Sequence, residues 1–356
     1  MISLMDYGYT EAENPPDGLI PARVTEIQRE KCIVMTERGE VTATLKGAFK
    51  HNAKDRGDFP CVGDFVFLQY NANGESRIDK ILPRRSKFSR ADLSGHAAGY
   101  VKTVLEQVIA ANFDFVFIIS SLNLDFNTNR ILRYITQARQ SGGQPVVILT
   151  KADLVRDTDA AINAVRAVAS DVPTHAISSH TGYGLDNLTG YLLPGKTAVI
   201  LGMSGVGKSS LLNALMNREV MAVKATREGD SRGRHTTTHR QLFMLPSGAM
   251  VIDTPGMREL GLFDADNAIG AGFSDVEQLF TQCRFADCRH QTEPDCAVLA
   301  AIEDGLLPRE RWELYLAQKQ EAAFVEDKAG YLRERGEKFK AMSKHMRKEY
   351  RDKRKY

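Results

Sequence analysis

The sequence lacks any long hydrophobic run. Its longest apolar stretches, such as Phe115–Ile119 and Ala198–Leu201, fall far short of the ~20 residues with which an apolar helix crosses a bilayer. The first residues hold neither a basic segment nor a sustained apolar one, so we expect no signal peptide. These absences favour a cytoplasmic protein that does not enter a membrane, in which the short apolar runs are buried strands.

The chain also has few cysteines and little net charge. Only five cysteines are present, and 47 basic side chains nearly balance 45 acidic ones, for a formal net charge of +2. Three of the cysteines cluster beside a histidine, which favours a reducing compartment and a bound metal over a disulfide framework. At 356 residues the chain is longer than one typical domain and fits two or three.

Residues 18–83 alternate apolar and polar side chains in short runs separated by turn signals. This pattern predicts strands at Leu19–Ile27, Lys31–Thr36, Val41–Leu45, Asp64–Tyr70 and Arg77–Leu82. Five short strands are typical of a small barrel, and we favour the OB type, which often binds RNA or single-stranded DNA. An SH3-like or other small barrel with a purely structural role is the alternative.

A basic linker, Pro83–Arg90, separates this region from an α/β pattern, because Pro83 favours a domain boundary. Strands then alternate with helices, which predicts a parallel sheet covered on both faces. The predicted strands are Phe113–Ser120, Pro145–Leu149, Thr174–Ile177, Thr197–Leu201 and Met250–Ile252, and the predicted helices are Asn129–Gln140, Thr158–Ala169 and Ser210–Met216. From about Asn267 the chain becomes helical, so we expect domains at 1–85, 86–265 and 266–356.

The most specific motif is a phosphate loop between a predicted strand and a predicted helix. It reads Gly202-Met203-Ser204-Gly205-Val206-Gly207-Lys208-Ser209. Its glycines let backbone N–H groups point at phosphate oxygens, and the helix dipole adds positive potential. We expect Lys208 to reach the β- and γ-phosphates and the Ser209 hydroxyl to bind Mg²⁺, with Ser210 completing the loop's nucleotide contacts.

Two further segments are typical of nucleotide-dependent switches. Asp253-Thr254-Pro255-Gly256 follows an apolar strand, so Asp253 can hold Mg²⁺ through water and the Gly256 N–H can contact the γ-phosphate. Residues 227–240 are polar and contain Thr236-Thr237-Thr238, of which we favour Thr237, with Thr238 as the alternative, as a Mg²⁺ ligand. An ordinary polar loop or edge strand is the other interpretation.

Thr150-Lys151-Ala152-Asp153 resembles the N-K-x-D guanine motif with threonine in place of asparagine. The Asp153 carboxylate can accept hydrogen bonds from guanine N1–H and the 2-amino group, which adenine does not offer in that arrangement. Lys151 can cover the base plane, and a backbone N–H of Ser178 or Ser179 can contact the guanine oxygen. For Ser178 a helix cap is the alternative role.

A cysteine cluster lies in the C-terminal region. Cys283, Cys288, His290 and Cys296 supply three sulfurs and one imidazole within 14 residues. This set is common in closed structural zinc sites, although its C-x4-C-x-H-x5-C spacing departs from the usual C-x2-C. Buried apolar cysteines with a solvent-facing His290 are the alternative. We expect one structural zinc per chain.

The base motif precedes the phosphate loop, whereas in a Ras-like GTPase it follows it, and this order indicates a circularly permuted GTPase domain. With a small barrel before it and a cysteine cluster after it, the arrangement resembles the ribosome small-subunit-dependent GTPases of the RsgA/YjeQ family. The resemblance rests on G-M-S-G-V-G-K-S, T-K-A-D, R-H-T-T-T and D-T-P-G. It implies binding of GTP and GDP, hydrolysis stimulated by the 30S subunit, late small-subunit maturation and contact with 16S rRNA. We expect a monomer.

The catalytic group is not evident from the motifs. Met257 stands where Ras-like enzymes place a water-orienting glutamine, so unaided hydrolysis should be slow. We favour His235 as a catalytic residue, with His239, Arg232, Arg234 or the ribosome as alternatives. The segment 337–356 carries nine basic and three acidic residues, and we favour rRNA contact over a solvated tail.

Two other classes of function fit parts of the sequence. A zinc-stabilised RNA-binding protein could hold its nucleotide as a structural ligand, but the complete switch motifs argue against this. An ATP-dependent enzyme of phosphoryl transfer or repair is opposed by Asp153. The roles of Cys32 and Cys61 are not indicated by any motif.

Overall fold

The computed structural model describes residues 3–10, 14–28, 31–47, 49, 56–92, 105–123, 126–221, 240–253, 269–270 and 272–326. The chain divides into two compact units, Met1–Arg90 with Glu106–Leu260 and Ala91–Leu105 with Gly261–Tyr356. No helix in the described ranges has the length and apolarity needed to cross a bilayer.

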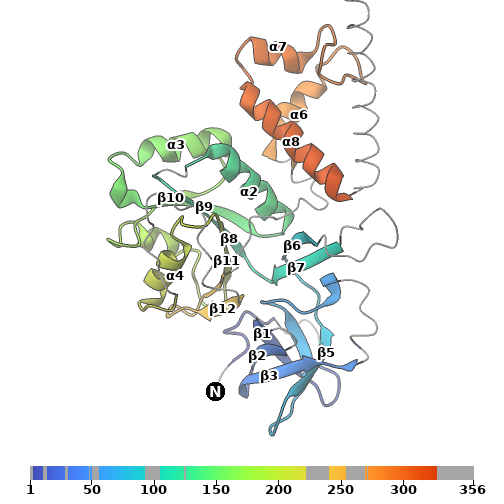
Figure 1. The fold of residues 1–356 in the computed structure, drawn as a ribbon, viewed down its shortest axis with the longest axis vertical. Coiled ribbons are helices and arrows are strands. Elements are labelled where there is room, and N and C mark those ends of the chain that lie inside the picture. The colour runs from blue at the N-terminus through green and yellow to red at the C-terminus, as the bar shows by residue number, and fades with distance from the viewer. Residues whose placement is uncertain are drawn as a thin grey trace, which may run out of the picture. The chain divides into compact units, whose positions relative to one another are not determined.

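The first part of the chain forms a closed five-stranded barrel (Figure 1). Its strands are β1 (Ile20–Gln28), β2 (Lys31–Thr36), β3 (Gly39–Leu45), β4 (Phe65–Gln69) and β5 (Ser76–Ile81). All neighbouring strands are antiparallel except β3 and β5, which are parallel, and pairing of β1 with β4 closes the ring. Alternate side chains fill its interior, among them Val24, Val34, Leu68 and Ile78. The predicted OB-like barrel is confirmed, with strand ends within two residues of those expected.

The central α/β domain is built on a mainly parallel sheet with the order β10-β9-β8-β11-β13-β12. The strands are β8 (Phe115–Ser121), β9 (Gln144–Thr150), β10 (Thr174–Ala176), β11 (Thr197–Gly202), β12 (Gln241–Met244) and β13 (Met250–Asp253). Only β12 runs antiparallel to its neighbour in this group.

Both faces of this sheet are covered, as the near-continuous apolar strands predict. Along β8, Val116 and Ile118 join the apolar cluster beneath α2 (Thr128–Gln140) and α3 (Asp159–Val168). Phe117 and Ile119 point to the opposite face and join the cluster beneath α4 (Lys208–Met216). Alternation along a single strand therefore builds two cores.

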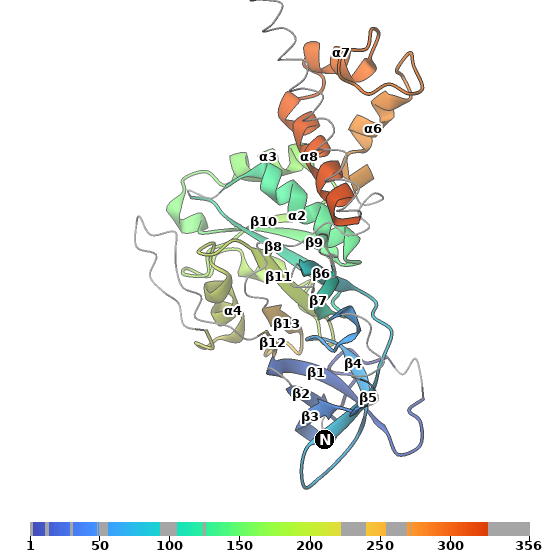
Figure 2. The same cartoon turned by 45° about the vertical axis from the view of Figure 1, so that its right-hand side comes forward.

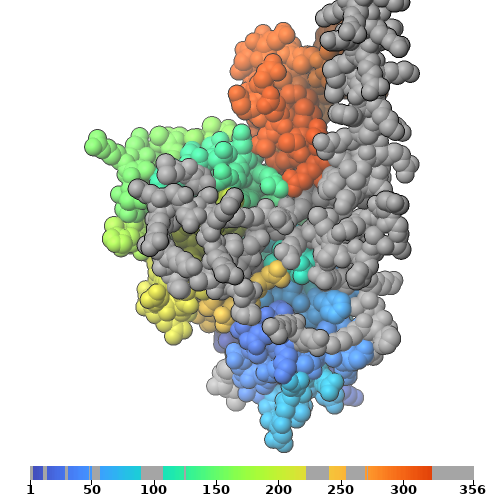
Figure 3. Space-filling model, viewed as in Figure 1, coloured from blue at the N-terminus to red at the C-terminus, as the bar shows by residue number. Residues whose placement is uncertain are grey.

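The barrel continues the sheet of the α/β domain. Glu26 of β1 pairs with Gln241 of β12, and together the two parts make one sheet of eleven strands (Figure 2). Figure 3 shows the segment 240–253, in gold, directly against the blue surface of the barrel. The edge of the α/β sheet is thus occupied by a barrel strand.

The prediction of a linker at Pro83–Arg90 was wrong for its second half. Lys87–Asp92 forms β6, which pairs with β7 (Leu105–Ala111) in a two-stranded sheet. Phe88 is buried there and stacks on Phe113 with ring centroids 5.1 Å apart. The three residues between Pro83 and Lys87 are all charged or polar, and this polar run masked the one buried phenylalanine, Phe88, that anchors the strand.

The second unit is mainly helical over its described residues 269–270 and 272–326. It contains α6 (Ser274–Phe280), α7 (Ala297–Glu303) and α8 (Arg309–Glu326). Phe273, Phe280, Trp312 and Tyr315 form its aromatic core. Arg311 of α8 donates two hydrogen bonds of 2.6 Å to Asp275 of α6 and so joins the two helices.

Candidate functional site

The predicted nucleotide-binding residues meet at one edge of the central sheet. Thr150 ends β9, Gly202 ends β11 and Asp253 ends β13, while Ser178 follows β10 by two residues. These four strands are parallel, so their carboxyl ends share the edge at which α/β sheets bind ligands. The fold therefore gathers segments that are up to about 100 residues apart in the sequence.

The phosphate loop is shaped by two glycines, Gly205 and Gly207, with φ of 81° and 98°. The α4 helix begins at Lys208, and no side chain caps its start, which suits an anion at the first N–H groups. The Lys208 ammonium donates to the carbonyls of Gly202 at 2.8 Å and Met203 at 2.6 Å. The lysine therefore lies across the loop, within reach of any phosphate held there.

Thr150 connects the base motif with the phosphate loop. Its buried hydroxyl donates to the Val206 carbonyl at 2.5 Å. Lys151 adopts a left-handed conformation, φ 62°, and the Ala152 N–H donates to the Ile177 carbonyl at 3.0 Å. Asp153 is exposed, so its carboxylate can face a base that arrives from solvent.

Ser178 organises the loop that follows β10. It is fully buried, its N–H donates to the Tyr183 carbonyl at 2.9 Å, and its hydroxyl accepts from the N–H groups of His180 and Thr181. The Ser178 N–H is thus engaged within the loop. The Ser179 N–H makes no hydrogen bond to the described residues, so it is the better placed of the two to meet a base.

The four metal-ligand candidates lie together in the second unit. The ligand atoms of Cys283, Cys288, His290 and Cys296 all lie within 4.8 Å of one another. The His290 Nδ1 is 3.5 Å from the Cys283 Sγ and 3.4 Å from the Cys296 Sγ. Burial lowers the pKa of His290, which favours the neutral imidazole that binds metals.

Neighbouring side chains hold the ligands of this cluster in place. The His290 ring stacks on Phe280 at 4.4 Å and meets Trp312 edge-on at 5.7 Å. Glu293 accepts backbone hydrogen bonds from Arg289, Gln291 and Thr292. These backbone bonds, that of Gln291 first, lower the pKa of Glu293 to about 2. No sequence motif points to Glu293, because an acidic residue in a polar loop carries no signal of this role.

Comparison with known proteins identifies the family. A model of the RsgA GTPase family matches residues 81–263. A Lactiplantibacillus plantarum protein named small ribosomal subunit biogenesis GTPase RsgA 2 is 42% identical over 327 residues, which cover 91% of this chain and 90% of the relative. The chain belongs to the RsgA GTPase family. It is accordingly a GTPase, which hydrolyses GTP.

Further relatives agree with this assignment. An RsgA protein of the same description from Opitutus terrae is 40% identical over 87% of this chain and 85% of its own length. The crystal structure of YjeQ from Thermotoga maritima matches with a TM-score of 0.60 at 26% identity, over 84% of this chain and 96% of that one. YloQ, described as a circularly permuted GTPase, has a TM-score of 0.55 at 24% identity over 85% and 94%, and this likeness shows the fold alone.

The RsgA fold was therefore predicted correctly: an OB-like barrel, a circularly permuted GTPase domain and a helical region with a Cys₃His cluster. Several site predictions fall outside the described residues: His235, Thr237 and Gly256, with the alternatives Thr236, Thr238, His239, Arg232 and Arg234, and Met257. The basic segment 337–356 lies outside them as well.

Proposed function

We propose that this RsgA-family GTPase binds the small (30S) ribosomal subunit and acts in its late maturation, with GTP hydrolysis to GDP and phosphate stimulated by the subunit. The observation that carries the proposal is the convergence of phosphate loop, base motif and Asp253 on one sheet edge. Relatives named for small-subunit biogenesis, 40–42% identical over most of the chain, support the choice of partner.

The phosphate end of GTP would lie over the loop 202–209. Backbone N–H groups and the start of α4 would bind the phosphate oxygens, and Lys208 would exchange its two carbonyl partners for the β- and γ-phosphates. Ser209, Asp253 and Thr237 would hold Mg²⁺, with Asp253 acting through water. Gly256 would donate its N–H to the γ-phosphate, so hydrolysis would change the contacts of the switch segments.

The guanine base would be read mainly by Asp153. Its carboxylate would accept from N1–H and the 2-amino group, while the Lys151 stem covers the base plane. Thr150 directs its hydroxyl hydrogen to Val206, so we assign it a positioning role that ties the base motif to the phosphate loop. Ser178 would hold the shape of the loop that follows β10. The Ser179 N–H of the same loop would donate to the guanine oxygen.

The cysteine cluster would hold one structural zinc. Three sulfurs and one imidazole within 4.8 Å of one another make a closed four-ligand set. When bound, the zinc would supply no chemistry beyond fixing the loop between α6 and α7. Phe280 and Glu293 would orient the ligands from outside, one by stacking on the imidazole and the other by bonding the loop backbone.

We propose that RNA contacts come from the parts that flank the GTPase domain, with domains at 1–85, 86–265 and 266–356. The barrel, the zinc-binding region and the basic segment 337–356 would bind 16S rRNA. The protein would act as a monomer in the cytoplasm, without a membrane. Affinity for the subunit should fall steeply with salt, because each neutralised RNA phosphate releases counterions.

A catalytic role of His235 can be tested separately. In His235→Ala, we expect the subunit-stimulated rate to fall by about 100-fold, the range of one general acid–base or positioning group, with unchanged GTP affinity. Measuring single-turnover hydrolysis with saturating subunits checks this, and His239→Ala is the matched control. A wild-type rate in His235→Ala would remove this residue from the mechanism.

The proposed function is tested by steady-state hydrolysis of GTP and ATP by the full chain in Mg²⁺, with small or large ribosomal subunits. We expect slow GTP turnover that rises with small subunits alone, and no ATP turnover. Equal use of both nucleotides, or indifference to the subunits, would contradict it.

A further inference from the structure

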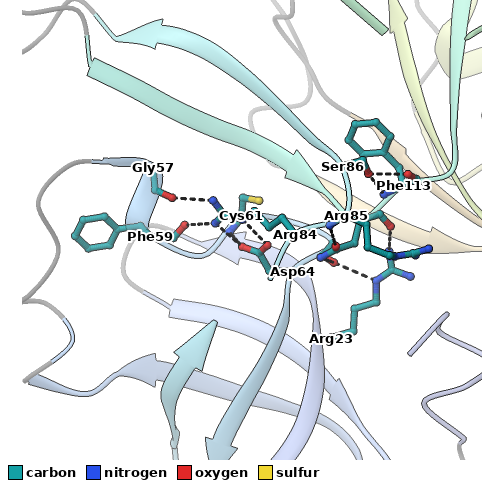
Figure 4. Close-up of polar contacts among 11 residues, drawn as sticks. Arg23, Gly57, Phe59, Cys61, Asp64, Arg84, Arg85, Ser86 and Phe113 are labelled. Carbon is teal, nitrogen blue, oxygen red and sulfur yellow. Dashed lines mark hydrogen bonds and ion pairs between the residues drawn. The ribbon is translucent and has the colours of Figure 1, made fainter. Parts of the chain in front are cut away.

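A single buried arginine joins the barrel to the GTPase sheet. Arg23 lies on β1 and is completely buried, the largest of the fully buried side chains in the described residues. Its Nε donates to the Gly63 carbonyl at 3.3 Å and one Nη donates to the Asn112 carbonyl at 2.8 Å (Figure 4). The other Nη donates to the Tyr7 carbonyl and contacts the Met250 Sδ at 3.1 Å. Four separate segments therefore meet on one guanidinium.

The Arg23 cation has acidic neighbours, Asp114 and Asp64, but its hydrogen bonds go to uncharged groups. Among the described residues, none of its direct hydrogen-bond partners is a carboxylate, and its guanidinium also lies over the Phe65 ring, 4.9 Å from the ring centre. Burial, with repulsion from Arg85, lowers the pKa of Arg23 to about 9. A buried cation whose direct partners are neutral is costly unless its geometry is complete, so each of these contacts matters.

Met250 places this arginine on the strand that carries Asp253. The strand β13 begins at Met250 and ends at Asp253, which is itself buried. The barrel also approaches β13 at Gly63, where an added Cβ would lie 3.1 Å from the Cδ1 of Ile252. The neighbouring strand β12 is paired with β1 through Gln241 and Glu26. Both strands of the β12–β13 hairpin therefore rest on the barrel.

We propose that Arg23 is a positioning residue for GTP hydrolysis, through which the barrel sets the position of β13 and hence of Asp253 at the magnesium site. The inference rests on the proposed role of Asp253 in holding Mg²⁺. It makes the barrel a structural part of the nucleotide site as well as a module for binding RNA. A displacement of the barrel would reach Asp253 along the four residues of β13, Met250–Asp253.

A partly buried arginine in the same region, Arg84, provides a control. Arg84 forms a bidentate ion pair with Asp64, with two N–H···O distances of 2.8 Å, and donates to the carbonyls of Gly57 and Phe59 (Figure 4). These partners, Asp64, Gly57 and Phe59, belong to the barrel and the loop that enters β4. Replacing either arginine by lysine keeps the charge and removes the planar fork of donors.

The test compares Arg23→Lys, Met250→Leu and Arg84→Lys in the full chain. Met250→Leu removes the sulfur that contacts Arg23 and nearly conserves volume, so it should fold even if Arg23→Lys does not. For each protein, the Mg²⁺ concentration giving half-maximal GTP hydrolysis is measured, together with GDP affinity in EDTA. Hydrogen exchange of the amides of Met250–Asp253 and the melting temperature are recorded alongside.

We expect Arg23→Lys to need about tenfold more Mg²⁺, as is typical when an outer positioning contact of a metal site is lost. Met250→Leu should shift the requirement in the same direction by less, and both should speed exchange in β13 without changing GDP affinity in EDTA. Arg84→Lys should lower the melting temperature and leave the Mg²⁺ requirement unchanged.

A wild-type Mg²⁺ requirement in both Arg23→Lys and Met250→Leu would overturn the inference, whatever their melting temperatures. An equal shift in Arg84→Lys would do the same, because it would show a general effect of weakening the barrel. Wild-type protein that turns over GTP without Mg²⁺ would instead contradict the proposed magnesium site, and the inference with it.

Discussion

The predicted nucleotide-binding residues lie at the carboxyl-end edge of the central sheet, here called the nucleotide edge. This edge and the cysteine cluster position their residues in different ways. At the nucleotide edge, parallel strands and buried hydrogen bonds such as Thr150 to Val206 hold the residues in place. In the cluster, the ligands come from a loop between two seven-residue helices, with His290 and Asp295 in left-handed conformations, φ 57° and 58°. Partial desolvation, then hydrogen bonds with the neighbouring thiols of Cys296 and Cys283, raise the pKa of Cys288 to about 11.

The strand packing of a sheet can position the residues of a site by itself. The cluster differs, because its closely spaced thiols need a bound cation to be stable as deprotonated ligands. Binding of the ion and folding of the surrounding loop are then the same event. The two regions should therefore respond differently when ligand or packing is removed.

Removing the proposed zinc should have the largest effect. A structural zinc contributes about 10 kcal/mol or more to the folding of its region. We expect a strong chelator to unfold the region of α6 and α7 while GDP affinity stays unchanged, measured by circular dichroism and by fluorescent-nucleotide titration. Loss of both signals together would show that the two regions are not independent.

The substitution Gly63→Ala should give the next largest loss of stability, at the junction of the barrel and the GTPase domain. Gly63 has φ of 93°, and an added Cβ would lie 2.1 Å from the Ala111 carbonyl oxygen. We expect Gly63→Ala to cost about 3 kcal/mol or more in urea unfolding, since backbone would have to move.

Gly18→Ala is the matched control for this prediction. Gly18 also has a positive φ, 78°, but no atom lies within 4 Å of its added Cβ. It should cost only about 1 kcal/mol, the conformational part of the effect. Equal costs at the two positions would mean that the close approach at Ala111 contributes nothing.

Asp153→Asn should change the choice of base. Losing a carboxylate that accepts two hydrogen bonds should weaken GDP binding by about 100-fold. An asparagine amide can donate to the 2-oxo group of xanthine, so affinity for xanthosine diphosphate should rise. Competitive titration with both nucleotides measures this, and an unchanged preference for GDP would exclude Asp153 from base recognition.

Thr150→Val should have the smallest effect. The variant keeps the shape of the side chain and loses one buried hydrogen bond to the phosphate loop, which is worth about 1 kcal/mol. GDP affinity should fall about fivefold. Thr174→Val, which loses a bond of 3.2 Å to the Val172 carbonyl at the opposite end of β10, should leave affinity unchanged.

Motifs and strands were predictable because their signals are local. The strand Lys31–Thr36 was predicted at its observed ends, and the phosphate loop was located between the expected strand and helix. The junction was not predictable, because Arg23 meets residues 89 and 227 positions away in the chain. A lone arginine in an amphipathic strand looks solvent-facing until the fold covers it.

The loop that follows β10 is a second feature that the sequence alone did not predict fully. The sequence allowed either Ser178 or Ser179 to meet the base, since both follow the strand. Only the structure shows that the Ser178 N–H is engaged by the Tyr183 carbonyl, a contact made by a turn whose closure depends on three-dimensional packing.

The most direct test measures steady-state GTP hydrolysis in Mg²⁺ by zinc-loaded and zinc-free protein, each with and without small ribosomal subunits. We predict the same slow rate for both forms alone, and stimulation by subunits only for the zinc-loaded form. Equal stimulation of the zinc-free form would contradict the separation of the nucleotide edge from a zinc-dependent ribosome contact.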